Sequence, residues 1–491
     1  MLLKSVFLIT LFFFFFLFPL STSSATSPPA TVCIVGSGIA GSSLAHFLRR
    51  YSLPSSSRII MFDRNPVVGG RMATVTIAGH TFEAGASILH PKNYHAANFT
   101  EMYKLGRKKP VRSESSISLA IWDGQRFVFK TMSVESKSPL VQKIVSLANS
   151  VYMLFHYGFS LLKMDNFVED MLSKFLKYYE SFETRPIFET VDEMLKWAGL
   201  YNLTTRTLEE ELFEVGLSPL LVKELVTVIT RINYGQNVDI NGLAGAVSLA
   251  GSGGGLWAVE GGNWRMAAGL INSSDVELHL LEEITSISYL GKYYELSSTH
   301  GKTYTCEVSV IATPLDEVNI QFAPRISIPK RNLQHTHATF VRGLLNPVYF
   351  GMKAVSEIPE LVGTIEDVDI PFSSISVLKQ HNETDMTYKI FSRKVMDDAL
   401  LDDIFSARTD TIRINWAAYP HYNAPEVFAP FILDSWHLYY VNAFENAAST
   451  METSAVAAEN VARLILSRLF GDGPRSSPNC SSDEEILHSD L

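Results

Sequence analysis

The sequence predicts an α/β protein in which a Rossmann-type dinucleotide-binding domain is combined with a discontinuous α+β substrate domain. Three observations at the N-terminal end predict this class. An apolar strand at 31–35 runs directly into the pattern Gly-x-Gly-x-x-Gly at 36–41, an amphipathic helix follows, and a second strand at 58–62 ends at Asp63. A strand, a glycine-rich turn, a helix and a strand in this order are typical of a parallel sheet that binds a dinucleotide.

The three glycines have different physical roles in such a turn. Gly36 permits the tight turn from strand to helix, Gly38 lets the backbone approach a pyrophosphate, and Gly41 lets the helix pack closely on the strand. The N–H groups at the start of the helix attract phosphate, and Asp63 is placed to accept hydrogen bonds from the ribose. The predicted contacts in this segment are Gly36, Ser37, Gly38, Ile39, Ala40, Gly41 and Asp63.

A second glycine-rich segment favours FAD over a nicotinamide cofactor. The run Arg64-Asn-Pro-Val-Val-Gly-Gly70-Arg71-Met72 resembles the second fingerprint of FAD enzymes of the glutathione-reductase and amine-oxidase type. The segment 82–90, which contains Gly85, Ala86 and Ser87, resembles the part of those enzymes that passes the flavin ring. Arg64, Gly70, Arg71 and residues 85–87 are therefore candidate FAD contacts.

Two later segments resemble the same superfamily. Residues 308–314 read as a buried strand that returns to the FAD domain after an adenine-contacting strand at 276–278. Near the C-terminus, Ser449 and Glu452 form the Ser-x-x-Glu pattern of a capping box before an apolar helix at 453–470. In FAD oxidases such a helix points its N-terminus at the flavin, which makes Glu445 and Met451 candidate contacts.

The composition indicates a folded chain and excludes several classes of function. The chain has 491 residues, of which 46% are hydrophobic and 19% charged, and its formal net charge is −10. This apolar content supports large cores, whereas an acidic chain without basic runs is a poor nucleic-acid binder. No Cys or His cluster with metal-ligand spacing is present, so no metal site is predicted.

The first residues resemble a targeting segment. Lys4 precedes an apolar run at 6–20, and small residues follow at Ser23 and Ala25, which predicts a signal peptide at 1–25. An uncleaved anchor is the alternative, but the run is shorter than the roughly 20 residues that cross a bilayer and contains Pro19. Secretory targeting makes five sequons candidate glycosylation sites: Asn98, Asn202, Asn272, Asn382 and Asn479.

The cysteines at 33, 306 and 480 rule out a disulfide-rich scaffold. Three cysteines allow at most one intramolecular disulfide. Cys33 lies inside a predicted buried strand, and we interpret it as a small core hydrophobe.

The middle of the chain is predicted to be helical between about 130 and 245. Residues 138–162 are long, apolar and aromatic, which is typical of a core helix, the wall of an apolar cavity or a membrane-surface helix. Thr190-x-x-Glu and Thr207-x-x-Glu are capping boxes for two short helices. His335 and His337 would share one face of a strand, where they are candidate substrate contacts; no acidic third ligand is evident nearby.

These segments predict a division of the chain into discontinuous domains. The FAD-binding domain comprises 30–130, 245–325 and 435–470, and the substrate domain comprises 131–244 and 326–434. A polar tail at 471–491 is predicted to be disordered.

Residues 30–470 as a whole resemble the prenylcysteine oxidase family, also called prenylcysteine lyases. The resemblance rests on the segments 36–41, 65–72, 82–91 and 447–458. It implies an FAD-dependent thioether oxidase of the lysosome or vacuole, with possible contact with a membrane surface. Its substrates would be S-farnesyl- or S-geranylgeranyl-cysteine, O2 and water, and its products a prenyl aldehyde, cysteine and hydrogen peroxide. The residues at 138–180 would then form a tunnel for the prenyl chain.

Two other functions are compatible with the same order of motifs. One is an amine or polyamine oxidase of the same superfamily. The other is a non-enzymatic prenyl-binding protein, like the Rab escort and GDP-dissociation-inhibitor proteins that this fold also resembles. Those proteins are cytosolic, whereas this chain begins with a predicted signal peptide and carries Asp63 and Gly-Gly-Arg71.

Overall fold

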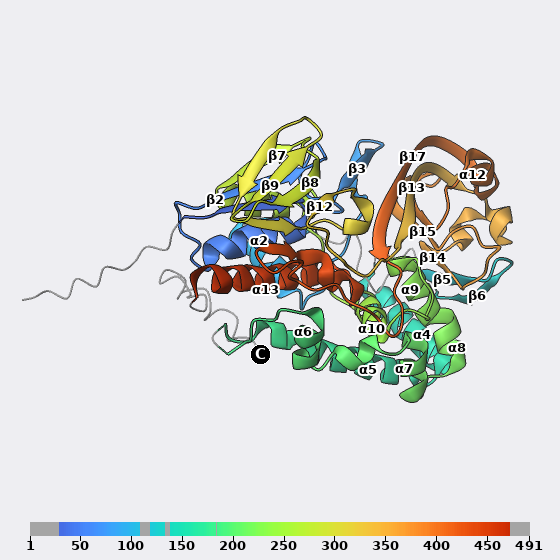
Figure 1. Ribbon diagram of the computed structural model, residues 1–491. Helices are drawn as coiled ribbons and strands as arrows, with labels where there is room; N and C mark the ends of the chain where they lie inside the picture. The colour runs from blue at the N-terminus through green and yellow to red at the C-terminus, as the bar shows by residue number, and fades with distance from the viewer. Residues whose placement is uncertain (1–28, 109–117, 133–137, 183, 472–491) are drawn as a thin grey trace, which may run out of the picture.

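The computed structural model of the chain describes residues 29–108, 118–132, 138–182 and 184–471. The predicted signal peptide at 1–25, the tail beyond Gly471, and with it Asn479 and Cys480, lie outside the described residues. The chain forms a sheet-and-helix body at one end and a second body of helices and strands at the other, as Figure 1 shows.

A five-stranded parallel sheet forms the centre of the first body. Its order is β18-β11-β1-β2-β7. The strands are β1 (Thr31–Val35), β2 (Arg58–Asp63), β7 (Val276–Leu280), β11 (Val308–Ile311) and β18 (Leu438–Tyr440). Strands from both ends of the chain therefore belong to one sheet, in which β11 lies between β1 and β18. The predicted strands at 31–35, 58–62 and 276–278 are confirmed, and the strand expected over 308–314 is present but ends at Ile311.

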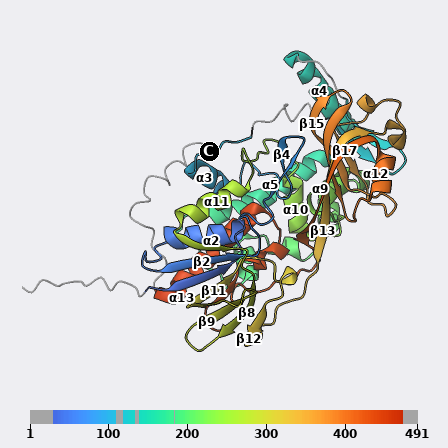
Figure 2. The ribbon, with the colours of Figure 1, turned by 90° about the horizontal axis from the view of Figure 1, so that it is seen from above.

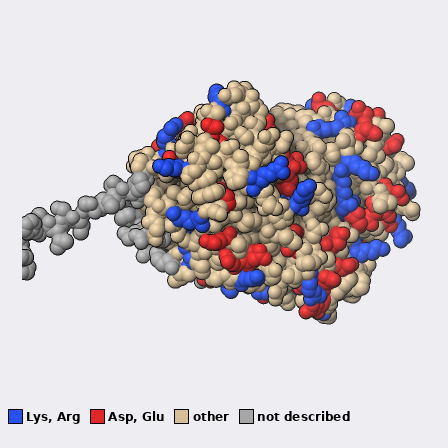
Figure 3. All heavy atoms as spheres, in the orientation of Figure 1, with Lys and Arg blue, Asp and Glu red and all other residues tan. Residues whose placement is uncertain are grey.

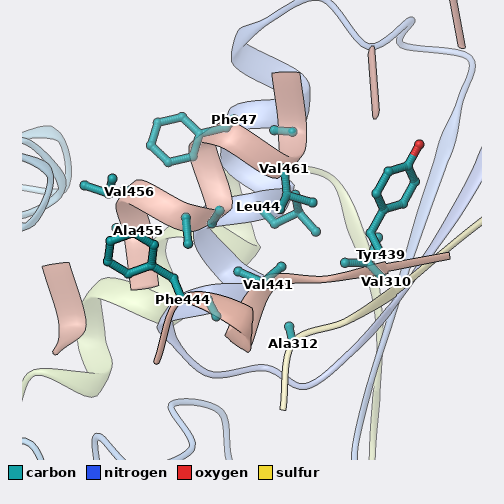
Figure 4. Close-up of a cluster of buried hydrophobic side chains, with 14 of the residues drawn as sticks. Leu44, Phe47, Val310, Ala312, Tyr439, Val441, Phe444, Ala455, Val456 and Val461 are labelled. Carbon is teal, nitrogen blue, oxygen red and sulfur yellow. The ribbon is translucent and has the colours of Figure 1, made fainter. Parts of the chain in front are cut away.

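Helices cover this sheet and bury its apolar side chains. They are α2 (Ile39–Arg50), α3 (Tyr94–Met102), α11 (Trp264–Ser273) and α13 (Met451–Phe470). Figure 4 shows Leu44 of α2, Val461 of α13 and Val310 of β11 in one cluster, in which all three side chains are fully buried. Burial of apolar surface of this extent is the main force that holds a doubly covered sheet together.

A smaller four-stranded sheet lies beside the central one, in the order β10-β9-β8-β12. Its strands are β8 (Ile284–Tyr289), β9 (Tyr294–Ser298), β10 (Thr303–Cys306) and β12 (Gln321–Ala323). A disulfide joins Cys33 of β1 to Cys306 of β10, with a Cα–Cα distance of 5.9 Å. Our interpretation of Cys33 as a plain core hydrophobe was wrong, because a strand signal carries no information about a partner 273 residues away.

A seven-stranded mixed sheet dominates the second body, in the order β17-β13-β16-β15-β14-β5-β6. The strands are β5 (Leu119–Trp122), β6 (Phe127–Lys130), β13 (Leu333–Leu345), β14 (Leu361–Thr364), β15 (Ser374–Asn382), β16 (Asp385–Ser392) and β17 (Phe405–Pro420). Helix α12 (Asp398–Ile404) precedes β17, and β3 (Thr74–Ile77) and β4 (His80–Glu83) form a separate two-stranded hairpin that packs against β13. Because β5 pairs with β14, residues 119–130 belong to this sheet, and we propose a domain boundary before β5 instead of at 130.

Helices complete the second body. They are α4 (Pro139–Tyr157), α5 (Ser160–Phe175), α6 (Val191–Ala198), α7 (Leu208–Glu214), α8 (Pro219–Leu221), a π-helical turn (Val222–Val226), α9 (Thr227–Tyr234) and α10 (Gly242–Ala250). Both predicted capping boxes, at Thr190 and Thr207, are present. The single helix expected over 138–162 is instead two helices, because the chain turns at Gly158 with φ 63°.

Short 3-10 turns connect the longer elements. They lie at Leu176–Tyr179, Tyr201–Thr204, Leu315–Glu317, Pro347–Phe350, Val355–Glu357 and Val441–Asn446. Over the described ranges, no helix combines the length and apolar character that spanning a bilayer requires. Acidic and basic side chains are interspersed on the face shown in Figure 3, and no large basic area is visible there.

Candidate active site

A cavity of about 670 Å³ lies where the two bodies meet. One end is lined by the turn after β1, the segments that follow β2 and β11, and the start of α13. The other end is lined by residues of α5, α9, α10, β13 and β17. The cavity therefore joins the predicted dinucleotide segments to the predicted substrate segments.

The glycines at the first end form a cradle of bare backbone. Gly36 adopts φ 114°, and a Cβ there would lie 2.5 Å from the carbonyl oxygen of Ala312. A Cβ on Gly41 would lie 2.0 Å from the carbonyl oxygen of Gly36, so the turn requires glycine at both positions. Gly38 is different, because a Cβ there would meet nothing closer than the oxygen of Gly69 at 3.7 Å.

The cradle is suited to an anionic group. Gly38 is the N-cap of α2, yet no side chain caps this helix and no acidic residue stands in its first turn. The segment 69–70 pairs with the turn, since the N–H of Gly69 donates to the carbonyl of Ser37 at 3.1 Å. Bare backbone at an uncapped helix N-terminus is the arrangement that binds a pyrophosphate.

Asp63 closes the cradle at the end of β2. Its Oδ2 accepts hydrogen bonds from the N–H and the hydroxyl of Ser37, at 2.9 and 2.6 Å. Its Oδ1 accepts from the backbone and the side chain of Asn65, both at 2.9 Å. These bonds fix the carboxylate at the cavity wall. Residues 282–284 line this end after β7, whereas the expected adenine contacts at 276–278 do not.

Arg71 is held in place by a buried carboxylate. Its guanidinium donates to the carbonyl of Ala418 at 2.7 Å and forms an ion pair with Glu445. Glu445 also pairs with Arg331 at 3.4 Å. Burial alone opposes ionisation of Glu445, but the two arginines lower its pKa below the usual range. Arg71 lines the cavity, and Glu445 positions it from behind.

Helix α13 begins at the cavity. Residues 449–454 line the cavity, and the N-cap is Thr450, whose hydroxyl accepts from the N–H of Thr453. The predicted capping pair Ser449–Glu452 was wrong by one residue. Glu452 instead accepts from the N–H groups of His95 and Ala96 and from the hydroxyl of Tyr179, which ties α13 to α3.

A buried lysine that the sequence did not indicate lies behind the segment 85–87. Lys389 of β16 donates to the hydroxyl of Ser87 and to the carbonyl of Glu83, both at 3.1 Å. Burial lowers the pKa of Lys389 to about 8 and raises the pKa of Glu83 to about 7. A cation is therefore held directly behind Ser87, at the cavity wall.

The second end of the cavity is mainly apolar. Its lining side chains are Met171, Leu172 and Phe175 of α5, Ile232 and Tyr234 of α9, Val247 and Ala250 of α10, and Trp416 and Tyr419 of β17. The Trp416 indole donates to the carbonyl of Ala84 at 2.9 Å, which fixes the ring against the cradle segment. Of the predicted tunnel region 138–180, only the end of α5 reaches the cavity.

Only one of the two predicted histidines faces the cavity. His335 lines it, and its Nδ1 lies 3.0 Å from the side-chain oxygen of Asn415, which also lines it. His337 lies on the same strand outside the lining. The described residues hold no group of three or more His, Cys, Asp or Glu side chains that suits a metal ion.

The predicted dinucleotide contacts fall into two groups. Most of them line the cavity: Gly36, Gly38, Ile39, Ala40, Asp63, Arg64, Gly70, Arg71, Gly85, Ala86, Ser87 and Met451. Ser37, Gly41 and Glu445 do not line it and instead hold lining residues in position. The sequons at Asn98, Asn202, Asn272 and Asn382 are exposed and stay predictions.

Sequence reasoning missed Arg331, Lys389, Asn415 and Trp416. Each lies in the predicted substrate-domain segment 326–434, in which His335 and His337 were the only candidate contacts. The burial of an arginine or lysine on a strand has no local sequence signal, because its partner comes from a distant segment.

Comparison with known proteins agrees with this geometry. The prenylcysteine lyase family model matches residues 140–475, and an NAD(P)-binding Rossmann-like domain model matches residues 34–104. The chain is 65% identical to farnesylcysteine lyase of Arabidopsis thaliana, over 94% of this chain and 93% of that protein. It is 34% identical to prenylcysteine oxidase 1 of Homo sapiens, over 91% and 90% of the two chains.

Solved structures support the fold. Putrescine oxidase superposes with a TM-score of 0.57 at 12% identity, over 90% of this chain and 100% of that one. Cyclohexylamine oxidase from Brevibacterium oxydans superposes with a TM-score of 0.58 at 16% identity, over the same shares of the two chains. At such identities the likeness concerns the fold alone. The sequence matches are much stronger, with 65% identity over 94% of this chain and a family model that covers residues 140–475. They show that the chain belongs to the prenylcysteine lyase family.

Proposed function

We propose that this chain is an FAD-dependent thioether oxidase that converts S-prenylcysteine, O2 and water into a prenyl aldehyde, free cysteine and hydrogen peroxide. The chain is an oxidoreductase of a family whose members are named for prenylcysteine cleavage. One observation carries the proposal. A single cavity joins a backbone cradle for a dinucleotide to a compartment of apolar side chains that suits a prenyl chain.

The cradle residues fit FAD. Gly36, Gly38 and the start of α2 would hold the pyrophosphate, and Asp63 would accept the ribose hydroxyls. The N-terminus of α13 and the Arg71 guanidinium supply positive potential where reduction adds negative charge. The chemistry that bound FAD would supply is acceptance of a hydride from the carbon attached to sulfur and transfer of the electrons to O2.

The chain's own residues would act by position and by excluding water. Side chains of α5, α9 and α10 hold the prenyl group, and this orients the allylic carbon next to sulfur. His335 and Asn415 are the polar groups that we assign to the cysteine end of the substrate. His337 is not assigned this role, because it does not line the cavity. No side-chain nucleophile is needed, since water cleaves the oxidised thioether.

The alternatives have less support. The amine oxidases among the solved structures share 12 to 16% identity with this chain, which carries no argument about substrate. A non-enzymatic prenyl-binding role leaves the glycine cradle, Asp63 and Arg71 without a purpose.

An absorbance spectrum tests the proposal. Purified protein is expected to show flavin bands, and anaerobic addition of farnesylcysteine should bleach them. Admission of air should restore the bands with release of one hydrogen peroxide per aldehyde. Protein that binds no flavin, even on reconstitution, contradicts the oxidase. Flavin bands that bleach with amines but not with farnesylcysteine contradict the substrate.

We also propose that the protein acts in the secretory pathway, in the lysosome or vacuole. The proposal rests on the apolar run at 6–20 and on the exposed sequons. Removal of N-glycans should increase the protein's electrophoretic mobility. Protein from its native cells that shows no shift and co-sediments with cytosolic markers would contradict it.

A further inference from the structure

Helix α4 and the start of α5 carry a ridge of apolar side chains directed away from the protein. We define the α4 ridge as Leu140, Ile144, Leu147, Val151, Phe155 and Phe159. The spacing of 4, 3, 4 and 4 residues places the five side chains of α4 along one side of that helix, and Phe159 follows the turn at Gly158. Phe155 is 86% exposed and Leu147 67% exposed. A continuous exposed apolar strip of this kind marks an interaction surface.

The C-terminal half of α4 contacts the rest of the protein on the side opposite the ridge. The Tyr157 hydroxyl and the His156 ring both contact the Glu224 carboxylate, at 3.0 Å. The Tyr152 ring stacks on Phe129 of β6, with centroids 5.2 Å apart. The ridge is therefore presented outward by a docked helix, and Figure 2 shows α4 projecting at the edge of the second body.

The charge around the ridge distinguishes it from the rest of the chain. The net charge of the protein is −10, yet residues 139–164 contain no Asp or Glu. Two lysines, Lys143 and Lys163, lie exposed in this segment. Lysines beside an apolar helix face, with aromatic residues on that face, are the pattern of a helix that lies in the interface of an anionic bilayer.

A second copy of the chain is a poorer occupant of the ridge. Helix α4 has 19 residues, fewer than three heptads, whereas a coiled coil needs three or four. It also supplies no Asp or Glu that could pair with Lys143 of a second copy.

We propose that the α4 ridge docks the protein on a bilayer that contains anionic lipid. The helix that begins beside the ridge ends at the cavity, since Met171, Leu172 and Phe175 of α5 line the apolar compartment. Helix α5 has 16 residues and rises 1.5 Å per residue, so about 24 Å separate its start beside the ridge from its end at the cavity. A docked protein would thus hold its apolar compartment close to the membrane into which a prenylated substrate partitions. Only this last consequence rests on the proposed function.

Vesicle binding tests the proposal without any enzyme assay. The full chain, with its N-terminal residue determined by mass spectrometry, is mixed with vesicles of phosphatidylcholine and phosphatidylserine in a ratio of 7 to 3. The test variant is L147S/F155S/F159S. The control is V348S/V368S/V395S, whose positions are 77, 95 and 60% exposed and lie far along the chain from the ridge. Both carry the same N-terminal segment.

The test variant should show a partition coefficient at least about 30-fold lower than the control, because each large side chain contributes on the order of tenfold. Hydrogen exchange should slow at 140–162 when vesicles are added. Omitting phosphatidylserine should weaken binding, and K143E should act in the same direction.

Three outcomes would overturn the proposal. The first is equal vesicle binding by test variant and control. The second is protection that appears only outside 140–162. The third is a concentration-dependent dimer in light scattering that the test variant abolishes, which would assign the ridge to a second copy. Turnover of farnesylcysteine presented in detergent should be equal in all variants, so a failure of the proposed function shows itself separately.

Discussion

The two ends of the cavity are built in opposite ways. The cradle end consists of backbone from short local segments, in which Gly36, Gly38 and Gly41 lie within six residues of one another. The apolar end consists of side chains from α5, α9, α10 and β17, which are far apart in the chain. The turn of the cofactor end therefore tolerates no added atom at Gly36 or Gly41, whereas the substrate end can change in size and shape by single substitutions.

The largest expected effect is a difference in stability between two glycine-to-alanine substitutions in the cradle, at Gly41 and at Gly38. In Gly41→Ala the new Cβ meets the Gly36 oxygen at 2.0 Å, so the turn must move and the protein should lose about 3 kcal/mol or more of stability. In Gly38→Ala the new Cβ has space, so the fold should persist while flavin affinity falls at least roughly tenfold. Melting temperature and flavin content measure the two effects. Equal melting temperatures for the two variants would contradict the assignment.

A somewhat smaller loss of stability is expected when the carboxylate that holds Arg71 is removed. Glu445→Gln removes the carboxylate that Arg71 and Arg331 share, which should cost about 2 kcal/mol because Arg71 remains without a counter-charge, whereas Arg331 keeps its pair with Asp316. The matched control is Glu277→Gln, whose pair with Arg58 is exposed and should change stability by less than about 0.5 kcal/mol. Thermal unfolding of the two variants measures the difference. A loss of equal size in both would show that burial of the triad has no special effect.

The apolar end should respond in substrate binding alone. Val247→Trp places a large ring at the cavity wall, so kcat/KM for farnesylcysteine should fall about tenfold while flavin content is unchanged. Val427→Trp, at an exposed position, is the control. Steady-state kinetics with flavin absorbance measure both. A loss of flavin in Val247→Trp would mean that the two ends are not separate.

The smallest expected effect is the pH dependence of stability that arises from His46, in the helix behind the cradle. Burial, then Arg50 and His95, lower the pKa of His46 in α2 to about 4. A lowered folded-state pKa means that this contribution to stability is complete above the unfolded pKa of about 6.5 and is lost as the pH falls towards 4. The pH 7 minus pH 5 difference in melting temperature should be smaller in His46→Gln, by an amount equivalent to about 1 kcal/mol. If the melting temperatures of the unchanged protein and of His46→Gln fell in parallel between pH 7 and pH 5, the predicted contribution of His46 would be contradicted.

The same contrast explains how much the sequence could predict. The strand at 31–35, the glycine turn and Asp63 follow each other within about 30 residues, and each has a local signal of spacing or residue type. The capping boxes at Thr190 and Thr207 were predictable for the same reason.

The features that sequence reasoning missed all depend on distant partners. Cys33 pairs with Cys306 across 273 residues, and Lys389 reaches Ser87 from another sheet. β5 lies close to the cradle segments in sequence but pairs with β14. In the first case a buried cysteine has the same local pattern whether or not it is bonded, and in the others the partner is chosen by packing. For the same reason, the predicted tunnel region 138–180 was wrong in extent, because only the end of α5 lines the cavity.

The order of strands in the central sheet has a consequence for synthesis. β1 lies between β2 and β11, so one edge of the first strand made waits for β11 near residue 308, and β11 in turn waits for β18 near residue 438. The nascent chain thus exposes an apolar strand through most of translation. Closure of the disulfide between Cys33 and Cys306 then comes late. We expect chains truncated before residue 438 to be captured by chaperones and degraded rather than released as a folded N-terminal domain.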